Sequence, residues 1–217
     1  MTLAQELAAR LEQARANPDP ERSAVYAKAA EALAAADVEE NALRAGDVAP
    51  MFTLPDAFGN DVSLEEVLAH GPAIVSFYRG AWCPFCNLEL RALQRELAAV
   101  EEAGATLVAI SPNRPDVSLG VIEAHELTYP VLSDHDNLIA KQFNLVYEMI
   151  PEHVEYYRAH DRDIGAMNDT EAWELPVPAT YVIDQDGVIR YAFIDLNHRV
   201  RAEPSEVIAV AASLTKG

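Results

Sequence analysis

The chain contains two cysteines, Cys83 and Cys86, and only two residues separate them. At this spacing two sulfur atoms can form a disulfide, so that one thiolate attacks a substrate and the other thiol releases it. The pair therefore suits a redox centre. A disulfide staple, half of a metal site and two chemically inert buried thiols are the alternatives to be weighed.

The residues around the pair favour the redox centre. An apolar run of strand length, 73–78, precedes the cysteines, and an amphipathic helix is predicted from 84 to 102. Cys83 then falls just ahead of the helix and Cys86 one turn inside it, with Pro84 at the first helical position, where no N–H is required. A helix N-terminus carries unpaired N–H groups and a partial positive charge, which stabilise a thiolate.

A metal site finds little support. Cys-x-x-Cys supplies two of the four ligands of a zinc site, and the chain has no second cysteine pair. The histidines show no ligand spacing; they are His70, His125, His135, His153, His160 and His198. We therefore expect neither a metal nor another cofactor.

Composition excludes several classes of partner. The 217 residues include 16 Lys and Arg against 35 Asp and Glu, a formal charge of −19. Such a charge repels nucleic acid and anionic membranes, so neither is expected as a partner. No secretion signal or membrane-spanning apolar run is apparent. The expected location is the cytoplasm, where thiols stay reduced and structural disulfides are rare.

Two regions are expected along the chain. Residues 1–42 carry two helical patterns and are predicted to form an α-helical extension. In the first, Leu3, Leu7 and Leu11 recur at helical spacing and residues 17–20 end the helix; the second runs over about 21–36. We expect it to pack on its own domain, with a lid or a dimer contact as alternatives. Because the extension has no cysteine, histidine or recognisable motif, it is expected to be dispensable for thiol chemistry.

Residues 43–217 alternate between strand and helix patterns. Near the end, Ala179–Asp184 and Val188–Ile194 are predicted strands joined by Gln185-Asp186-Gly187, a hairpin signal. A terminal helix is predicted over Glu203–Lys216, with Pro204 in its first turn. The pattern predicts an α/β sandwich with a mixed sheet flanked by helices.

These motifs resemble the peroxiredoxin family (alkyl hydroperoxide reductase and thiol-specific antioxidant), which has a thioredoxin-like fold. The similarity covers about Leu43 to the C-terminus. The matching segments are Gly46–Asp56, Gly59 with Val62–Leu64, Phe77–Cys86, and Pro178–Asp184 with Gly187. The resemblance implies a thioredoxin-like three-layer sandwich and thiol-dependent reduction of hydrogen peroxide or organic hydroperoxides.

The chain also departs from the family pattern Pro-x-x-x-Thr-x-x-Cys. Aligned to it, Cys86 takes the position of the attacking cysteine, Cys83 that of the hydroxyl residue and Arg79 that of the proline. Typical peroxiredoxins place an arginine before the late strand, where this chain has Pro178, as thioredoxins do. The resemblance to thioredoxins makes the bond before Pro178 a candidate cis peptide; otherwise Pro178 only leads a strand.

Three functions follow from these observations. The leading one is a peroxidase in which one cysteine becomes a sulfenic acid, the other forms a disulfide with it, and a dithiol reductant such as a thioredoxin restores both. The first alternative is a thioredoxin-like protein disulfide oxidoreductase. The second is a redox-sensing binding protein. A homodimer is left open.

Of the two sulfurs, Cys83 is predicted to attack and Cys86 to resolve. Cys83 precedes the helix and is the more accessible to N–H groups, whereas apolar burial of Cys86 disfavours its thiolate. The alignment gives the opposite order. Trp82, Arg79 and Pro178 are predicted to support the site, although Trp82 also suits a core position and Arg79 a surface one.

Overall fold

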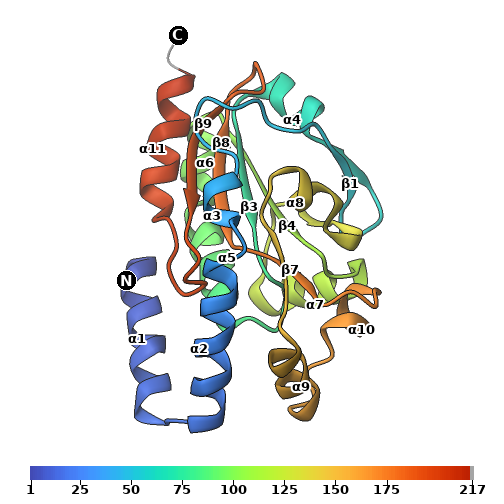
Figure 1. The fold of residues 1–217 in the computed structure, drawn as a ribbon. Coiled ribbons are helices and arrows are strands. Elements are labelled where there is room, and N and C mark those ends of the chain that lie inside the picture. The colour runs from blue at the N-terminus through green and yellow to red at the C-terminus, as the bar shows by residue number, and fades with distance from the viewer. Residues whose placement is uncertain (216–217) are drawn as a thin grey trace.

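A mixed five-stranded sheet forms the centre of the molecule in a computed structural model that describes residues 1–215 (Figure 1). The strand order is β5-β4-β3-β8-β9. β3, β4 and β5 run parallel, whereas β8 is antiparallel to both β3 and β9. The predicted sandwich and the predicted β8–β9 hairpin are confirmed. The strands are β3 (Ala73–Phe77), β4 (Thr106–Ser111), β5 (Val131–Ser133), β8 (Ala179–Ile183) and β9 (Ile189–Ile194).

Both faces of the sheet are covered because its strands are apolar on both sides. Along β3, Val75 and Phe77 point into one core, and Ile74 points into the other. The Val75 face packs against α4 (Leu64–His70), α8 (Leu138–Gln142) and the small sheet of β1 (Thr53–Pro55) and β2 (Asp61–Ser63).

The Ile74 face packs against the helices that follow the cysteines and end the chain. These helices are α5 (Pro84–Arg95), α6 (Leu97–Glu102), α7 (Pro115–His125) and α11 (Pro204–Leu214). The predicted helix over 84–102 is therefore two helices, because Glu96 leaves the helical region with φ −100° and ψ 7°. Pro204 occupies the start of α11 as predicted, and the predicted helix end at Lys216 lies outside the described residues.

The segment between β5 and β8 is more regular than expected. It contains a short 3₁₀ turn, η1 (His135–Asn137), followed by β6 (Val146–Glu148), α9 (Pro151–Ala159), α10 (Ile164–Asn168) and β7 (Glu174–Pro176). β6 and β7 pair antiparallel. For residues 151–173 the sequence predicts a helix followed by a loop; the helix is α9, and the expected loop contains α10. Strands of three residues, such as β6 and β7, carry too little periodicity to be predicted.

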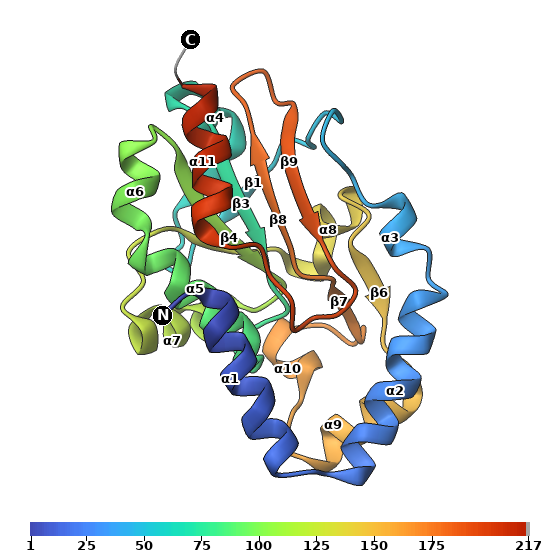
Figure 2. The same cartoon turned by 90° about the vertical axis from the view of Figure 1, so that its left-hand side faces the viewer.

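The extension consists of α1 (Leu3–Ala16), α2 (Pro20–Ala34) and α3 (Val38–Asn41), and α1 and α2 form a helical hairpin. Leu3 and Leu7 of α1 pack into the core that α5 shares. The Tyr26 hydroxyl of α2 lies 2.9 Å from that of Tyr157 on α9. Figure 2 shows α1 and α2 diverging from their connection, with α9 beside α2.

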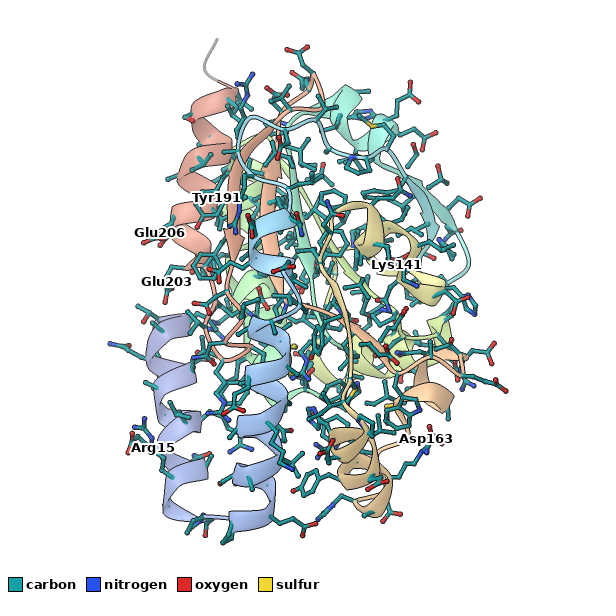
Figure 3. All side chains as sticks on the ribbon, viewed as in Figure 1. Arg15, Lys141, Asp163, Tyr191, Glu203 and Glu206 are labelled. Carbon is teal, nitrogen blue, oxygen red and sulfur yellow. The ribbon has the colours of Figure 1, made fainter. Side chains whose placement is uncertain are left out.

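Polar contacts also fasten the extension. Arg95 of α5 donates to Glu6 at 2.7 Å, and the Tyr156 hydroxyl donates to Asp19 at 3.1 Å. Glu203, at the start of α11, accepts from the backbone N–H of Ala4. Figure 3 places Glu203 close to the first turn of α1. The hairpin is therefore fixed to the sandwich at both of its helices. Within residues 1–215, none of the helices combines the length and apolar character needed to cross a bilayer.

Candidate active site

The two cysteines lie where β3 leaves the sheet and α5 begins. Cys83 has extended backbone angles (φ −89°, ψ 109°) and occupies the N-cap position, and Pro84 follows as the first helical residue. The N–H of Cys83 donates to the carbonyl of Gly80 at 3.1 Å, which closes a turn ahead of the helix. Cys86 lies in the first turn of α5. This is the strand-to-helix placement that the sequence predicted.

Close packing fixes the loop before Cys83. Gly80 has φ +138°, and a Cβ at this residue would lie 2.7 Å from Trp82 Nε1 and 2.9 Å from Asn113 Oδ1. The side chain of Asn113 accepts from the N–H of Ala81 at 2.8 Å. Any side chain at Gly80 would therefore displace both the loop and Trp82.

Both thiols are free and buried, yet they differ in access. Cys83 lines a cavity of about 460 Å³ together with Trp82, Pro84 and Phe85. Cys86 lies behind it and is not among the residues that line this cavity. A small molecule in the cavity therefore contacts Cys83 and not Cys86.

Arg201 is a site residue that sequence reasoning missed. Its Nη2 donates to Cys86 Sγ at 3.2 Å, and its Nε pairs with the buried carboxylate of Glu89. That carboxylate also accepts from Ser76 and Thr180, each at 3.4 Å. The chain thus lacks an arginine at the position of Pro178 but supplies one from the loop after β9. The one signal in the sequence is Glu89, an acidic residue within an amphipathic helix, whose burial requires a basic partner.

The charges around the sulfurs separate the two pKa values. Burial opposes ionisation of Cys83, but hydrogen bonding to Cys86 and the charges of Arg79 and Arg201 lower the pKa of Cys83 to about 6. Burial, together with the hydrogen bond and the charge of Cys83, raises the pKa of Cys86 well above its ordinary value. Near pH 7 the pair therefore holds one thiolate, on Cys83, and one thiol.

Arg79 and Trp82 lie beside Cys83. The guanidinium of Arg79 is buried, donates to the hydroxyl of Tyr147 at 3.2 Å and lies over the Trp82 ring at 4.8 Å from its centroid. Trp82 also packs edge-on against Tyr157. Arg79 is thus no surface residue, and Trp82 forms part of the cavity wall rather than of the deep core.

Pro178 does not have the expected conformation. Every peptide bond in the described part of the chain is trans, so the candidate cis bond at Val177-Pro178 is wrong. In this trans arrangement the N–H of Val177 bonds to the carbonyl of Leu145 at 2.8 Å, and the chain runs on extended into β8. Pro178 is buried there and does not line the cavity at Cys83.

The helical extension reaches the site. Residues of α1 and α2, among them Leu11 and Tyr26, line the cavity opposite Cys83. That these helices are dispensable for thiol chemistry stays a prediction, made because they contain no cysteine, histidine or recognisable motif. These helices form one wall of the cavity. Because that wall depends on how the helices pack, it cannot be predicted from a local sequence pattern.

No group of three or more His, Cys, Asp or Glu side chains is placed to hold a metal ion within residues 1–215. The arrangement instead provides a buried thiolate beside two arginines, a neighbouring thiol and a cavity that admits a small molecule. Such a set can attack an electrophilic oxygen or sulfur atom and then form a disulfide.

Comparisons with known proteins agree on one family. The model of the AhpC/TSA family matches residues 45–192, more than half of the chain. Rv2521, a candidate peroxiredoxin of Mycobacterium tuberculosis, is 32% identical over 151 residues, covering 68% of this chain and 82% of the relative. Peroxiredoxin Bcp of Escherichia coli is 28% identical over 155 residues, covering 71% and 88%.

Solved structures show the same fold at lower identity. Peroxidoxin BcpB from Mycobacterium tuberculosis superposes with a TM-score of 0.63 at 21% identity, covering 80% of this chain and 99% of that one. A cysteine-to-serine variant of PrxQ from Xylella fastidiosa gives 0.61 at 17% identity, covering 77% and 94%. The helices α1 and α2 lie outside the segment that the family model matches.

Proposed function

The chain belongs to the AhpC/TSA family of thiol-dependent peroxidases, and we propose that Cys83 attacks the peroxide and Cys86 resolves the product. The peroxiredoxin relatives and the family model support thiol-dependent reduction of a peroxide as its activity. The assignment of roles to the two cysteines rests on their access and their electrostatics. Cys83 lines the cavity and has the lowered pKa, whereas Cys86 lies behind it as a thiol.

In the first step the Cys83 thiolate attacks one oxygen of the hydroperoxide. A sulfur–oxygen bond forms, the oxygen–oxygen bond breaks, and the departing alkoxide or hydroxide takes a proton from solvent. The products are a sulfenic acid on Cys83 and an alcohol or water. Arg79 stabilises the negative charge that passes from sulfur to oxygen, because its buried guanidinium lies within the same wall.

In the second step the sulfur of Cys86 attacks that of Cys83. The sulfur–oxygen bond breaks, and the thiol proton of Cys86 leaves with the hydroxide as water. Arg201 lies 3.2 Å from Cys86 Sγ and stabilises the sulfur as it loses that proton. The result is a Cys83–Cys86 disulfide.

A dithiol reductant closes the cycle. Its thiolate attacks the disulfide, forms a mixed disulfide, and its second thiol releases the reduced enzyme. A thioredoxin-type protein suits this role, and a reducing compartment such as the cytoplasm maintains it. A homodimer is not required, because both cysteines come from one chain.

One observation carries the role of Cys83: it is the cysteine that lines the cavity, and its pKa of about 6 lies below neutral pH. The test measures, by stopped flow, how fast the reduced protein and its matched variants Cys83→Ser and Cys86→Ser consume peroxide. In the wild type, mass spectrometry of the peptide Trp82–Arg91 should show the loss of two hydrogens after one equivalent of peroxide.

The variants separate the two roles. Cys86→Ser should consume one equivalent of peroxide and accumulate a sulfenic acid on Cys83 that dimedone traps, whereas Cys83→Ser should consume peroxide at least a hundredfold more slowly. Fast consumption by Cys83→Ser would reverse the assignment in favour of the family alignment. If neither the wild type nor the variants consume peroxide, the peroxidase activity itself is excluded.

A further inference from the structure

The cavity at Cys83 has a charge opposite to that of the protein. The chain carries a formal charge of −19, yet no Asp or Glu is among the residues that line this cavity. Six of its 16 basic residues line it instead. They are Arg10, Arg15, Arg22, Arg79, Arg162 and Arg199. Like charges repel, so a cavity with this lining favours an anion.

Most of these arginines have no acidic partner. Arg15 pairs with Glu12, but within residues 1–215 no ion pair with Asp or Glu includes any of the other five. Two of the five, Arg79 and Arg162, lie over the rings of Trp82 and Tyr157. The Cys83 thiolate beside Arg79 and the Asp19 carboxylate near Arg22 offset part of this charge, but with six arginines the lining keeps a net positive charge.

The remaining wall suits an organic molecule. Leu11, Ala14 and Phe85 supply apolar surface, and the volume of about 460 Å³ is within the usual range for small-ligand sites. Two buried donors in the wall, Arg79 Nε and Trp82 Nε1, have no hydrogen-bond partner among the described residues. Hydrogen peroxide is neutral and far smaller than this cavity, so it requires neither the volume nor the charge.

We propose that this cavity binds a small organic molecule that bears a carboxylate, and that Arg10 and Arg22 of the helical extension select for it. The inference rests on the proposed function and names the class of molecule that reaches Cys83. Both arginines lie outside residues 45–192, the segment that the family model matches. The selectivity is therefore a property that the extension adds to the common domain.

Two kinds of molecule share this chemistry. A carboxylate-bearing hydroperoxide would oxidise Cys83 to the sulfenic acid as its oxygen–oxygen bond breaks. A carboxylate-bearing thiol would instead attack the Cys83–Cys86 disulfide, forming a mixed disulfide with Cys83 and releasing Cys86, and a second such thiol would complete the reduction.

The experiment compares charged and neutral molecules with the same reactive group. The oxidising arm uses cumene hydroperoxide with a para carboxylate and its methyl ester. The reducing arm uses 3-mercaptopropionate and 2-mercaptoethanol on the preformed disulfide. Each rate is measured for the full-length wild type, Arg10→Ala, Arg22→Ala and a control, Arg91→Ala, which removes an exposed arginine that does not line the cavity.

In one of the two arms, each cavity variant should lose about tenfold in kcat/KM or second-order rate with the anionic molecule, as expected for one lost charge-assisted contact. The same variant should change less than twofold with the neutral partner, and Arg91→Ala should change neither. High salt should reduce the preference of the wild type for the anion. Loss in the oxidising arm identifies the substrate, and loss in the reducing arm identifies the reductant.

Equal effects on charged and neutral molecules in both arms, or equal losses in Arg91→Ala, would overturn the proposal. Its failure is distinct from failure of the peroxidase cycle. If the cycle is right and the selectivity wrong, every variant still reduces hydrogen peroxide, and its rates with the carboxylate and with the methyl ester change by the same factor. If the cycle itself is wrong, no hydroperoxide is reduced by any of them.

Discussion

Replacing Arg79 by methionine tests how the structure activates Cys83. The ordinary pKa of a cysteine, 9.0, is lowered to about 6 at this residue. Since a tenfold change in an ionisation constant corresponds to about 1.4 kcal/mol, the surroundings favour the thiolate by roughly 4 kcal/mol. Arg79 shares this effect with Arg201 and with the hydrogen bond to Cys86. Loss of one such charge should raise the pKa of Cys83 to about 7.

The assay is the rate of alkylation by iodoacetamide between pH 4.5 and 9, with the modified cysteine identified by mass spectrometry. At pH 6 the thiolate fraction of Cys83 should fall from about a half to about a tenth, which lowers the rate about fivefold. At pH 8 both proteins hold mostly thiolate, and the rates should agree. Arg79→Lys keeps the charge and should restore most of the wild-type profile.

Two results would refute this reasoning. A rate midpoint near pH 9 in the wild type would mean that burial outweighs the arginines. An unchanged midpoint in Arg79→Met, with near-UV circular dichroism showing an intact fold, would mean that Arg79 only packs against Trp82.

Two further predictions concern stability. Glu89→Gln leaves the buried guanidinium of Arg201 without its carboxylate, so the free energy of unfolding in urea should fall by about 3–5 kcal/mol. The control Glu96→Gln, on the surface, should change this free energy by less than about 0.5 kcal/mol. Equal small effects of the two variants would contradict a buried ion pair. Burial, with Arg79 and Arg162, lowers the pKa of His153 to about 4 from 6.5, so the native state favours the neutral ring. The stability that this provides is complete above about pH 6.5 and is lost as pH falls toward about 4, by roughly 3 kcal/mol at most. His153→Gln should make the urea unfolding midpoint less dependent on pH across that interval, and an identical dependence would count against a buried neutral histidine.

Local pattern predicted the elements that position the thiols. The apolar run before Cys83 and the amphipathic repeat after it define β3 and α5, because strand and helix periodicities are properties of neighbouring residues. The order of the sulfurs was also predicted from position relative to the helix. That assignment stays a prediction, with the lowered pKa of Cys83 in its support.

What the sequence did not reveal depends on residues far apart in the chain. Arg201 reaches Cys86 across 115 positions, and an isolated basic residue in a loop carries no signal of its partner. The arginines of α1 and α2 line the same cavity as Cys83 only because the hairpin packs back on α5 and α9. The trans bond before Pro178 shows the opposite error, since a motif suggested a geometry that the neighbouring strands do not adopt.

The long separation between Arg201 and Cys86 has a consequence for biosynthesis. The ribosome makes a protein from its N-terminus, so both cysteines are synthesised more than a hundred residues before Arg201. A nascent chain that stops short of β9 lacks that arginine, and Cys83 then has one fewer positive charge to lower its pKa. The thiols are therefore least reactive while the polypeptide is incomplete, which is also the stage at which they are most exposed to unwanted oxidation. Reactivity comes with completion of the fold.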